Sequence, residues 1–346
     1  MDITRLATWI PPGRYTRISV LDVHTAGEPL RIVTGGIPEL KGATILERRR
    51  YAMEHLDYLR QTLMREPRGH PDMYGCLITP PVTDAADFGV IFMHNEGYST
   101  MCGHGIIAVA TAVLETRLFP VREPETTMKI DTPAGLVSAF CRVEHDRVRS
   151  VRFQNVPSFV EALAQTIGVP GVGWVTYDLA FGGAYYAFVN ATEVGLSCHP
   201  DECRILIEKG MAIKRAIMAH RTISHPFEPE MNFLYGTIFI APPHGKVASS
   251  RNVCVFAEGQ VDRSPTGTGV SARMALHYAK KELRLHESMI IESIIGSTFT
   301  GRVVDTIRYG PYDAVIPEVE GSAYITGRLE FLRDAGDPLV NGFTLS

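Results

Sequence analysis

Two short segments of the chain combine a reactive or hydroxyl side chain with a Gly-x-Gly turn that opens an apolar helix. The first begins at Cys102 and continues through Gly103, His104 and Gly105 into small apolar residues up to Leu114. Glycines at a helix start let backbone N–H groups approach a ligand, and the helix dipole favours an anion there. Gly103 and His104 are therefore predicted to donate N–H groups to a carboxylate. The free amides also favour a thiolate, so Cys102 is predicted to have a lowered pKa and to act as an acid or base.

The second segment lies nearly half a chain later and has the same pattern. It runs from Thr266 through Gly267 and Thr268 to Gly269, again ahead of a helix rich in small residues. Gly267 and Thr268 would donate to the same carboxylate if the two helix starts faced each other across a cleft. Thr266 stands where the first segment has Cys102, and a threonine hydroxyl is too weak an acid to serve as a base unaided. Its alternative role is an N-cap of the helix, a position that threonine favours.

Other residues near these segments offer further chemistry. Asp262 could bind a cationic amine from its loop, although an exposed surface carboxylate is the alternative. A metal site built from His94, Cys102 and His104 is disfavoured, because no second ligand pair with zinc spacing accompanies them, and no metal is predicted. A cysteine hydrolase that uses His24 or His94 is the weakest possibility, since nothing in the sequence marks a triad.

The elements that must position these residues form a mixed pattern, not a regular strand–helix alternation. Apolar segments rich in Val, Ile, Phe and Tyr predict strands, and two longer segments predict helices. The predicted strands include Arg17–Val23, Gly89–His94, Val137–Val143, Val148–Phe153, Tyr185–Val189, Gly236–Ile240 and Val253–Ala257, and the helices are Ile45–Glu66 and Pro200–Ala219. Because the Gly-x-Gly segments repeat, we expect two similar domains, each with a central small-residue helix wrapped by sheet. The expected boundary is the Asn155–Gly173 stretch, which carries Pro157 and Pro170.

Composition excludes several classes of protein. The chain has 346 residues, 45% of them apolar, which suits a globular protein of about two domains. Its 34 Lys and Arg against 38 Asp and Glu give a net charge of −4, so no nucleic-acid partner is predicted. No apolar run approaches the roughly 20 residues of a membrane span, and no secretory signal is visible, so no membrane association is predicted. Six scattered cysteines in such a chain indicate reduced thiols and a cytoplasmic protein.

The residues above resemble the proline racemase family, which shares its two-domain fold with diaminopimelate epimerase. The matching motifs begin at His24 (His-Thr-Ala-Gly-Glu-Pro), Gly69 (Gly-His-Pro-Asp-Met-Tyr-Gly), Met101 (Met-Cys-Gly-His-Gly), Phe181 (Phe-Gly-Gly) and Asp262 (Asp-Arg-Ser-Pro-Thr-Gly-Thr-Gly). They span nearly all of the chain. The resemblance implies an α/β (α+β) fold of two pseudo-symmetric diaminopimelate-epimerase-like domains, each a barrel-like sheet around a central helix. The implied domains are residues 1–155 and 156–337, with a final strand within 338–346 that returns to the first.

The resemblance also implies roles for individual residues. Cys102 would be the catalytic acid/base, and Asp262 would contact the substrate's ring nitrogen. The substrate carboxylate would be bound by Gly103, His104, Gly267 and Thr268. The family's racemases and hydroxyproline epimerases have a second cysteine where this chain has Thr266, whereas its members that dehydrate trans-3-hydroxy-L-proline have threonine. The resemblance therefore implies that this protein dehydrates trans-3-hydroxy-L-proline. It also implies that the reaction uses neither a metal nor pyridoxal phosphate, and that the protein is a homodimer.

One base suits this dehydration. In trans-3-hydroxy-L-proline the C2 hydrogen and the C3 hydroxyl share a face of the ring, so Cys102 alone could take the proton and return it to the departing hydroxyl. Thr266 on the far face would suppress inversion at C2. The alternatives are a 4-hydroxyproline epimerase or proline racemase with a water-assisted Thr266, and a non-catalytic amino-acid-binding relative. Contacts to the ring hydroxyl are open between Ser99, Thr100 and His70.

Overall fold

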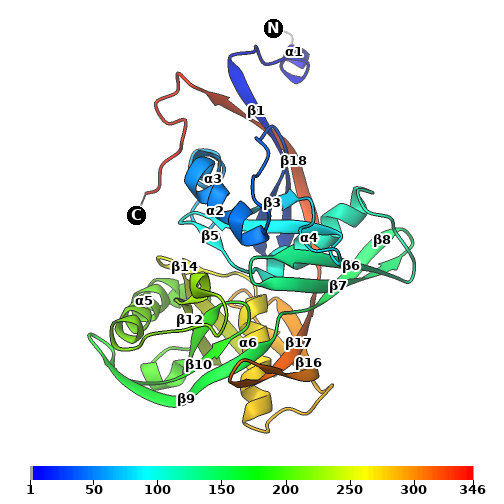
Figure 1. The fold of residues 1–346 in the computed structure, drawn as a ribbon. Helices are drawn as coiled ribbons and strands as arrows, with labels where there is room; N and C mark the ends of the chain where they lie inside the picture. Colours follow the sequence, from blue (N-terminus) through cyan, green and yellow to red (C-terminus); the bar gives the residue numbers. More distant parts are fainter. Residues whose placement is uncertain (1–2, 346) are drawn as a thin grey trace.

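The computed structural model describes residues 3–345 as two lobes, each a strongly curved sheet around one helix (Figure 1). The central helices are α4 (Gly103–Glu115) and α6 (Gly267–Ala279). From Gly103 to Leu114, and from Gly267 to Leu276, every residue is buried. A helix buried on all sides cannot be amphipathic, and small residues let the surrounding strands approach it.

The first lobe wraps α4 in a closed ring of strands. In chain order they are β1 (Tyr15–Thr25), β2 (Glu28–Gly35), β3 (Tyr74–Thr79), β4 (Phe88–His94), β6 (Glu125–Thr132), β7 (Gly135–Glu144), β8 (Arg147–Gln154) and β18 (Ala323–Asp334). Two outer helices, α2 (Ile45–His55) and α3 (Asp57–Met64), connect β2 to β3. The single helix predicted over Ile45–Glu66 is therefore interrupted, because Leu56 leaves the helical conformation between them. The short strand β5 (Tyr98–Ser99) leads into α4, and α1 (Thr4–Ala7) precedes β1.

The second lobe repeats this arrangement around α6. Its strands are β9 (Ser158–Val169), β10 (Gly173–Phe181), β11 (Tyr185–Asn190), β12 (Leu234–Ala241), β13 (Ser250–Phe256), β14 (Gln260–Val261), β15 (Ser288–Glu292), β16 (Thr298–Tyr309) and β17 (Tyr312–Gly321). Helix α5 (Cys203–His220) connects β11 to β12, as α2 and α3 connect β2 to β3. Short 3₁₀ turns cover Ala191–Val194, Pro200–Glu202 and Pro229–Met231.

Strand pairing follows the same order in both lobes. The pairs β2–β3 and β4–β6 are parallel in the first lobe, and β11–β12 and β13–β15 are parallel in the second. The predicted fold class, two pseudo-symmetric domains of the diaminopimelate-epimerase kind, is confirmed. The segment around Pro157 and Pro170 is not a loop, however: the prolines flank β9 and bound it at each end, where their missing N–H groups do not interrupt the ladder.

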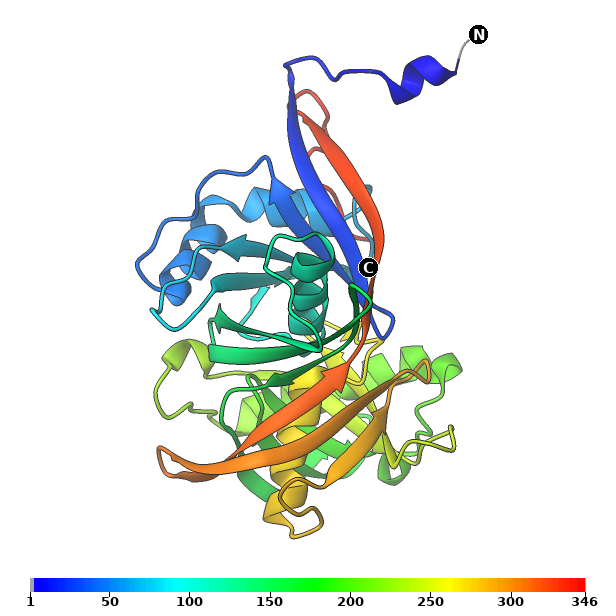
Figure 2. The same ribbon diagram turned by 90° about the vertical axis from the view of Figure 1, so that its right-hand side faces the viewer.

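One continuous run of strand closes both rings. Strand β17 pairs with β16 and β9 in the second lobe, and its last residues, Glu318–Gly321, pair with β8 of the first. After Ser322, β18 pairs with β1 along its whole length, so the run crosses from one lobe to the other (Figure 2). The predicted return to the first domain thus occurs over Ala323–Asp334, not over 338–346. Of that predicted strand, Ser346 lies outside the described residues, and Phe343 makes a single bridge with Glu66.

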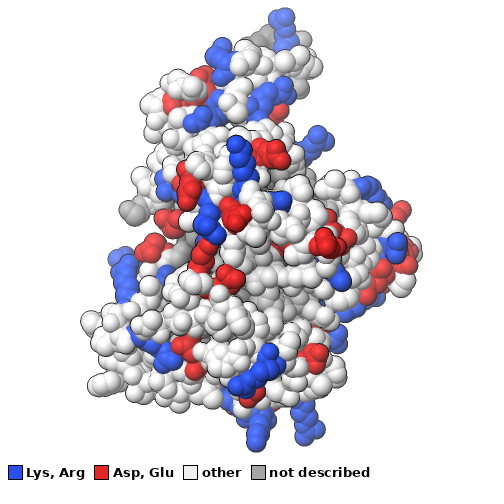
Figure 3. Space-filling model, in the orientation of Figure 1, with Lys and Arg blue, Asp and Glu red and all other residues white. Residues whose placement is uncertain are grey.

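The surface carries side chains of both charges. On the face shown in Figure 3, positive and negative side chains are interspersed. No helix within residues 3–345 has the length and apolar character needed to cross a membrane. All six cysteines are free thiols.

Candidate active site

The two central helices meet end to end at the boundary between the lobes. A Cβ atom added to Gly103 would lie 2.6 Å from the Cα of Gly267, and one added to Gly267 would lie 2.7 Å from the Cα of Gly103. Any side chain at either position would therefore push the helix starts apart. The glycines are required by this close approach of two backbones, which places the N–H groups of both helix starts beside one pocket.

All seven residues predicted for the site line this one pocket, although they come from two distant parts of the sequence. They are Cys102, Gly103, His104, Asp262, Thr266, Gly267 and Thr268. The pocket is tight, with a cavity volume of about 20 Å³, room for roughly one water molecule. Five further residues that the sequence analysis did not select complete its wall: Tyr74, Met101, Tyr186, Tyr235 and Phe256.

Cys102 is the N-cap residue of α4 and is 4% exposed. Its Sγ accepts a hydrogen bond from the Gly105 N–H at 3.2 Å and lies 3.3 Å from Nδ1 of the His104 imidazole. Burial nevertheless raises the pKa of the Cys102 thiol well above its ordinary value, and the nearby Asp262 and Glu28 carboxyl groups add to this rise. The Gly105 hydrogen bond opposes it. The predicted lowering of the pKa is therefore wrong, because the effect of burial on the thiol outweighs that of the helix start.

Thr266 faces the pocket from the start of α6 in an unusual backbone conformation. Its φ of +65° lies in the left-handed region, which a β-branched residue rarely adopts. Its side chain makes no capping hydrogen bond, so the structure does not support the N-cap interpretation. Apart from the neighbouring Cys254 thiol, its buried Oγ1 has no hydrogen-bond partner among residues 3–345. Backbone strain of this kind is typical of functional sites, and the Thr266 hydroxyl is available to form a hydrogen bond with a ligand.

Asp262 is buried, not the exposed loop carboxylate of the alternative interpretation, and its own turn holds it in place. Its Oδ1 accepts from the Ser264 N–H at 2.7 Å, and the Ser264 Oγ accepts from the Thr266 N–H at 3.1 Å. A second carboxyl group, that of the fully buried Glu28, accepts from the Arg263 N–H at 2.7 Å. Burial and then the neighbouring Asp262 carboxyl group raise the pKa of Glu28 well above its usual range.

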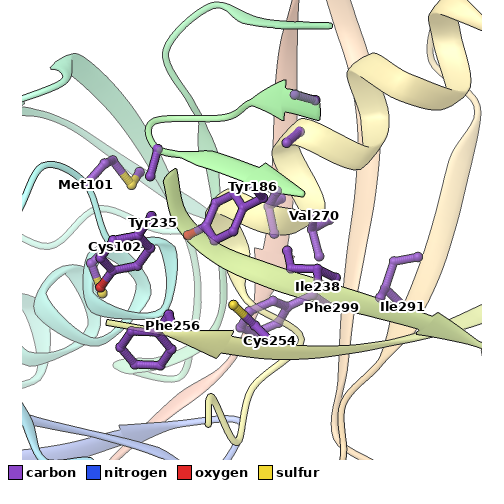
Figure 4. Close-up of a cluster of buried hydrophobic side chains, with 14 of the residues drawn as sticks. Met101, Cys102, Tyr186, Tyr235, Ile238, Cys254, Phe256, Val270, Ile291 and Phe299 are labelled. Carbon is purple, nitrogen blue, oxygen red and sulfur yellow. The ribbon is translucent and has the colours of Figure 1, made fainter. Parts of the chain in front are cut away.

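Aromatic side chains also line the pocket, and Figure 4 shows Tyr186, Tyr235 and Phe256 in the same buried cluster as Cys102. The Tyr74 hydroxyl donates to the Ser99 Oγ at 2.6 Å and lies 3.2 Å from the Tyr235 hydroxyl, and Tyr186 contacts the Thr268 Oγ1 at 2.7 Å. Burial raises the pKa of all three tyrosines, so their hydroxyls stay protonated. Tyr74 belongs to the motif that begins at Gly69, which was a usable signal; Tyr186 and Tyr235 lie in apolar strands without one.

The remaining candidates lie outside the pocket wall. Ser99 stands behind Tyr74, the Thr100 Oγ1 donates to the Gly183 carbonyl, and His70 contacts the Pro71 carbonyl. His24 stacks on Tyr324, and burial lowers the pKa of His94 to about 3. Neither histidine lines the pocket with Cys102, so the arrangement offers no triad through His24 or His94. Among residues 3–345, no three His, Cys, Asp or Glu side chains lie close enough together to hold a metal ion.

The architecture and this site define a protein of the two-barrel epimerase class. Its fold matches the crystal structure of a hydroxyproline epimerase from Agrobacterium vitis with bound trans-4-hydroxy-L-proline, with a TM-score of 0.89 and 33% identity over 95% of this chain and 96% of the other. Within that class, the chain belongs to the proline racemase family, whose sequence profile (Proline racemase) matches residues 20–344.

Two relatives of assigned activity cover nearly the whole chain. A trans-3-hydroxy-L-proline dehydratase of Colwellia psychrerythraea is 47% identical over 96% of this chain and 93% of its own length. A 3-hydroxyproline 2-epimerase of Burkholderia multivorans is 45% identical over 94% of this chain and 97% of its own length.

Proposed function

We propose that this protein is a hydro-lyase that dehydrates trans-3-hydroxy-L-proline. The observation that carries the proposal is the asymmetry of two otherwise matching helix starts: Cys102 supplies an ionisable sulfur at one, and Thr266 a hydroxyl at the other. The relatives named trans-3-hydroxy-L-proline dehydratase support the same substrate and reaction. The two glycines in contact support a site that binds one small ligand between the helix starts.

In this proposal the substrate carboxylate is bound by the backbone N–H groups of Gly103, His104, Gly267 and Thr268, where both helix dipoles favour an anion. The ring ammonium lies against the Asp262 carboxylate. Its positive charge offsets the acidic groups that raise the pKa of Cys102, so binding of the zwitterion favours the thiolate. The neutral Tyr74 and Tyr235 hydroxyls are the proposed contacts of the ring hydroxyl, in place of Ser99, Thr100 or His70.

The reaction is a syn elimination with Cys102 as its acid/base. The thiolate takes the C2 proton, and the electron pair of that C–H bond becomes the C2=C3 double bond. The C3–O bond breaks, and the departing hydroxide takes the proton from the Cys102 thiol and leaves as water, which restores the thiolate. The enamine product then tautomerises to Δ1-pyrroline-2-carboxylate. The N–H groups at both helix starts stabilise the negative charge that the carboxylate gains as C2 loses its proton.

The second candidate function is a 2-epimerase of 3- or 4-hydroxyproline or a proline racemase, in which water activated beside Thr266 would deliver a proton to the opposite face. The relative named 3-hydroxyproline 2-epimerase favours it. A non-catalytic amino-acid-binding relative is a third possibility. It would bind these amino acids tightly without exchanging their C2 hydrogen.

Product analysis distinguishes these functions. The purified protein is incubated in heavy water with trans-3-hydroxy-L-proline, trans-4-hydroxy-L-proline and L-proline separately. The proposal expects a ring imine that reacts with o-aminobenzaldehyde from the first substrate only, without inversion of the other two. A change of optical rotation with deuterium at C2, and no imine, would establish the epimerase instead. Binding without imine, rotation change or exchange would establish the binding protein.

We propose further that the protein is a homodimer in the cytoplasm. Strand β18 pairs with β1 on one side, and its exposed side chains include Tyr324, Ile325 and Leu329, which supports addition of a second copy along this strand. Light scattering should give twice the chain mass of 38.2 kDa, and the double variant Ile325→Lys, Leu329→Lys should give a monomer.

The free thiols support a location in the cytoplasm, which is a reducing compartment. Cell fractionation would test it.

A further inference from the structure

An arginine lies inside the second barrel, in the helix whose start faces the pocket. Arg273 of α6 is 2% exposed and donates to the Ser250 Oγ and the Asn252 Oδ1, each at 3.0 Å. It also donates to Nε2 of His277 at 2.9 Å, and Nδ1 of that ring contacts a Glu282 carboxylate oxygen at 2.7 Å. No carboxylate within residues 3–345 forms a direct ion pair with Arg273. Burial lowers its pKa to about 10, so it remains a cation at neutral pH.

The Arg273 contacts lead directly to the strained residue of the pocket. Asn252 accepts from Arg273 with its Oδ1 and donates from its Nδ2 to the Pro265 carbonyl at 3.1 Å. Pro265 precedes Thr266, whose φ is +65° and whose N–H is held by the Ser264 Oγ. A strained backbone conformation persists only when its surroundings hold it in place. The Arg273–Asn252–Pro265 contacts supply part of that hold.

The charge of Arg273 is retained at a cost that packing alone does not explain. A buried cation without a carboxylate partner is unfavourable, and an apolar side chain would fill the same space more cheaply. The matching helix α4 has an apolar residue, Val109, at the corresponding position, seven residues beyond Cys102 as Arg273 is beyond Thr266. The Arg273 guanidinium contacts Ser250 and Asn252 of β13 and His277, one turn further along α6.

We propose that Arg273 is a positioning residue for the carboxylate of an amino-acid ligand: through Asn252 it fixes the backbone turn that aims the Gly267 and Thr268 N–H groups, and its buried positive charge strengthens anion binding at that helix start. The inference rests on the proposed function only in placing a carboxylate at these N–H groups. It applies equally to a dehydratase, an epimerase and a binding protein of the same ligands.

Calorimetric binding of L-proline tests the proposal, because this ligand has the carboxylate but lacks a leaving hydroxyl. Arg273→Met is expected to weaken L-proline binding at least about tenfold, the equivalent of about 1.4 kcal/mol. It should also raise KM for trans-3-hydroxy-L-proline more than it lowers kcat. Arg273→Lys, which keeps the charge, should recover most of the affinity.

A second variant keeps the test decisive if Arg273→Met does not fold. Asn252→Asp leaves Arg273 in place but pairs it with a buried carboxylate and removes the donor to the Pro265 carbonyl, so it should weaken L-proline binding to a similar extent. Val109→Ala is the matched control: it damages the core at the corresponding position of α4 and should lower the melting temperature without changing L-proline affinity.

The inference would be overturned if Arg273→Met or Asn252→Asp folds and its affinity for L-proline stays within about twofold of that of the unaltered protein. It would also be overturned if Arg273→Lys binds L-proline no better than Arg273→Met. These results would leave the proposed function intact, because turnover of trans-3-hydroxy-L-proline by the unaltered protein tests that separately. If the unaltered protein binds no L-proline at any accessible concentration, the inference about Arg273 is overturned. If that protein still turns over trans-3-hydroxy-L-proline, only this inference fails and the proposed function stands.

Discussion

At the scale of single residues, the site depends on the difference between one sulfur and one hydroxyl at matching helix starts. Cys102 is enclosed and faces His104 and Asp262, whereas Thr266 is held in a strained conformation with its hydroxyl free of oxygen and nitrogen partners within the described chain. Burial raises the pKa of the sulfur, so the thiol is its resting form, and the ring ammonium of the proposed substrate supplies a charge that favours ionisation.

Cys102→Ser should abolish turnover and preserve binding. Serine can still accept from the Gly105 N–H, so the helix start keeps its shape, but a hydroxyl cannot serve as the base; we expect a loss of about 10³-fold or more in kcat. L-proline affinity measured by calorimetry should stay within about threefold, because the carboxylate contacts are backbone groups. Cys254→Ala is a control for loss of a buried thiol beside the pocket. Substantial turnover by Cys102→Ser would remove this sulfur from the chemistry.

Thr266→Cys should introduce an acid/base on the second face of the ring. We expect deuterium exchange or inversion at C2 of L-proline, followed by mass spectrometry and optical rotation, where the unaltered protein gives neither. Cysteine has no β-branch, so the positive φ is less strained and the variant should be at least as stable. Thr266→Ser controls for loss of the branch alone. Silence from a variant whose new thiol is shown to ionise would contradict the opposed placement of the two side chains.

The raised pKa of Cys102 predicts the pH dependence of activity. The reactive form is the thiolate, so kcat/KM of the free enzyme should rise with pH, by about tenfold per pH unit while pH lies below the thiol pKa. The rise should extend above about pH 8.5, the ordinary value for cysteine. Initial rates at low substrate concentration measure it. A profile that is flat from about pH 6 to pH 8 would show that the thiol is already ionised without ligand.

At the scale of elements, the site is a contact between two helix N-termini. The contacting residues have no side chains, so one backbone lies directly against the other. The spacing of the N–H groups on either side of the pocket is therefore set by the backbones themselves. This is the physical reason why two Gly-x-Gly segments in distant halves of the sequence belong to one site.

Gly103→Ala should disrupt the site more than the fold. Its Cβ would lie 2.6 Å from the Gly267 Cα, so the lobes must separate by a fraction of an ångström and the carboxylate contacts lengthen. We expect about a hundredfold loss of kcat/KM, since small misplacements of reacting groups have effects of this size. Gly97→Ala is the control, because a Cβ there meets nothing within 4 Å. Equal activity of the two variants would contradict a tight contact.

The sequence predicts those parts of the site that lie in segments with a local pattern. Six of the seven site residues could be predicted because they lie in two segments with their own local signal, a Gly-x-Gly turn before an apolar helix, and Asp262 lies four residues before the second of these segments. Tyr186 and Tyr235 could not be predicted, because they join the pocket only through strand pairing, which leaves no local pattern. The position of the returning strand was predicted too late in the chain, since much of Ala323–Asp334 is solvent-exposed and its apolar residues do not alternate as in a half-buried strand.

At the scale of the whole molecule, the run from β17 to β18 joins the lobes. Glu318 on this run is buried, and its carboxylate accepts from the Arg302 Nε of β16 at 2.8 Å and from Arg152 of β8 at 3.1 Å. One carboxylate thus connects strands of both barrels. Because the two barrels share a strand and an ion-pair cluster, we expect them to unfold together and not one at a time.

Glu318→Gln should lower the free energy of unfolding by about 2 kcal/mol, less than for a fully buried pair because both arginines are partly exposed. Urea denaturation followed by fluorescence and by circular dichroism should show one shared transition at a lower midpoint. Glu330→Gln is the matched control: its pair with Arg17 also joins two strands but is largely exposed, so we expect less than about 1 kcal/mol. Equal effects would show that the buried cluster adds no stability.

The shared run has a consequence for biosynthesis. A ribosome makes the first barrel's strands β1 to β8 before any of the second lobe, yet that barrel closes only with Glu318–Gly321 and β18. Until those residues emerge, the nascent first lobe is an open sheet whose β1 and β8 edges are unpaired, the condition under which chains associate with one another. The residues up to Asp334 must therefore be synthesised before α4 is enclosed and the Cys102 pocket can form.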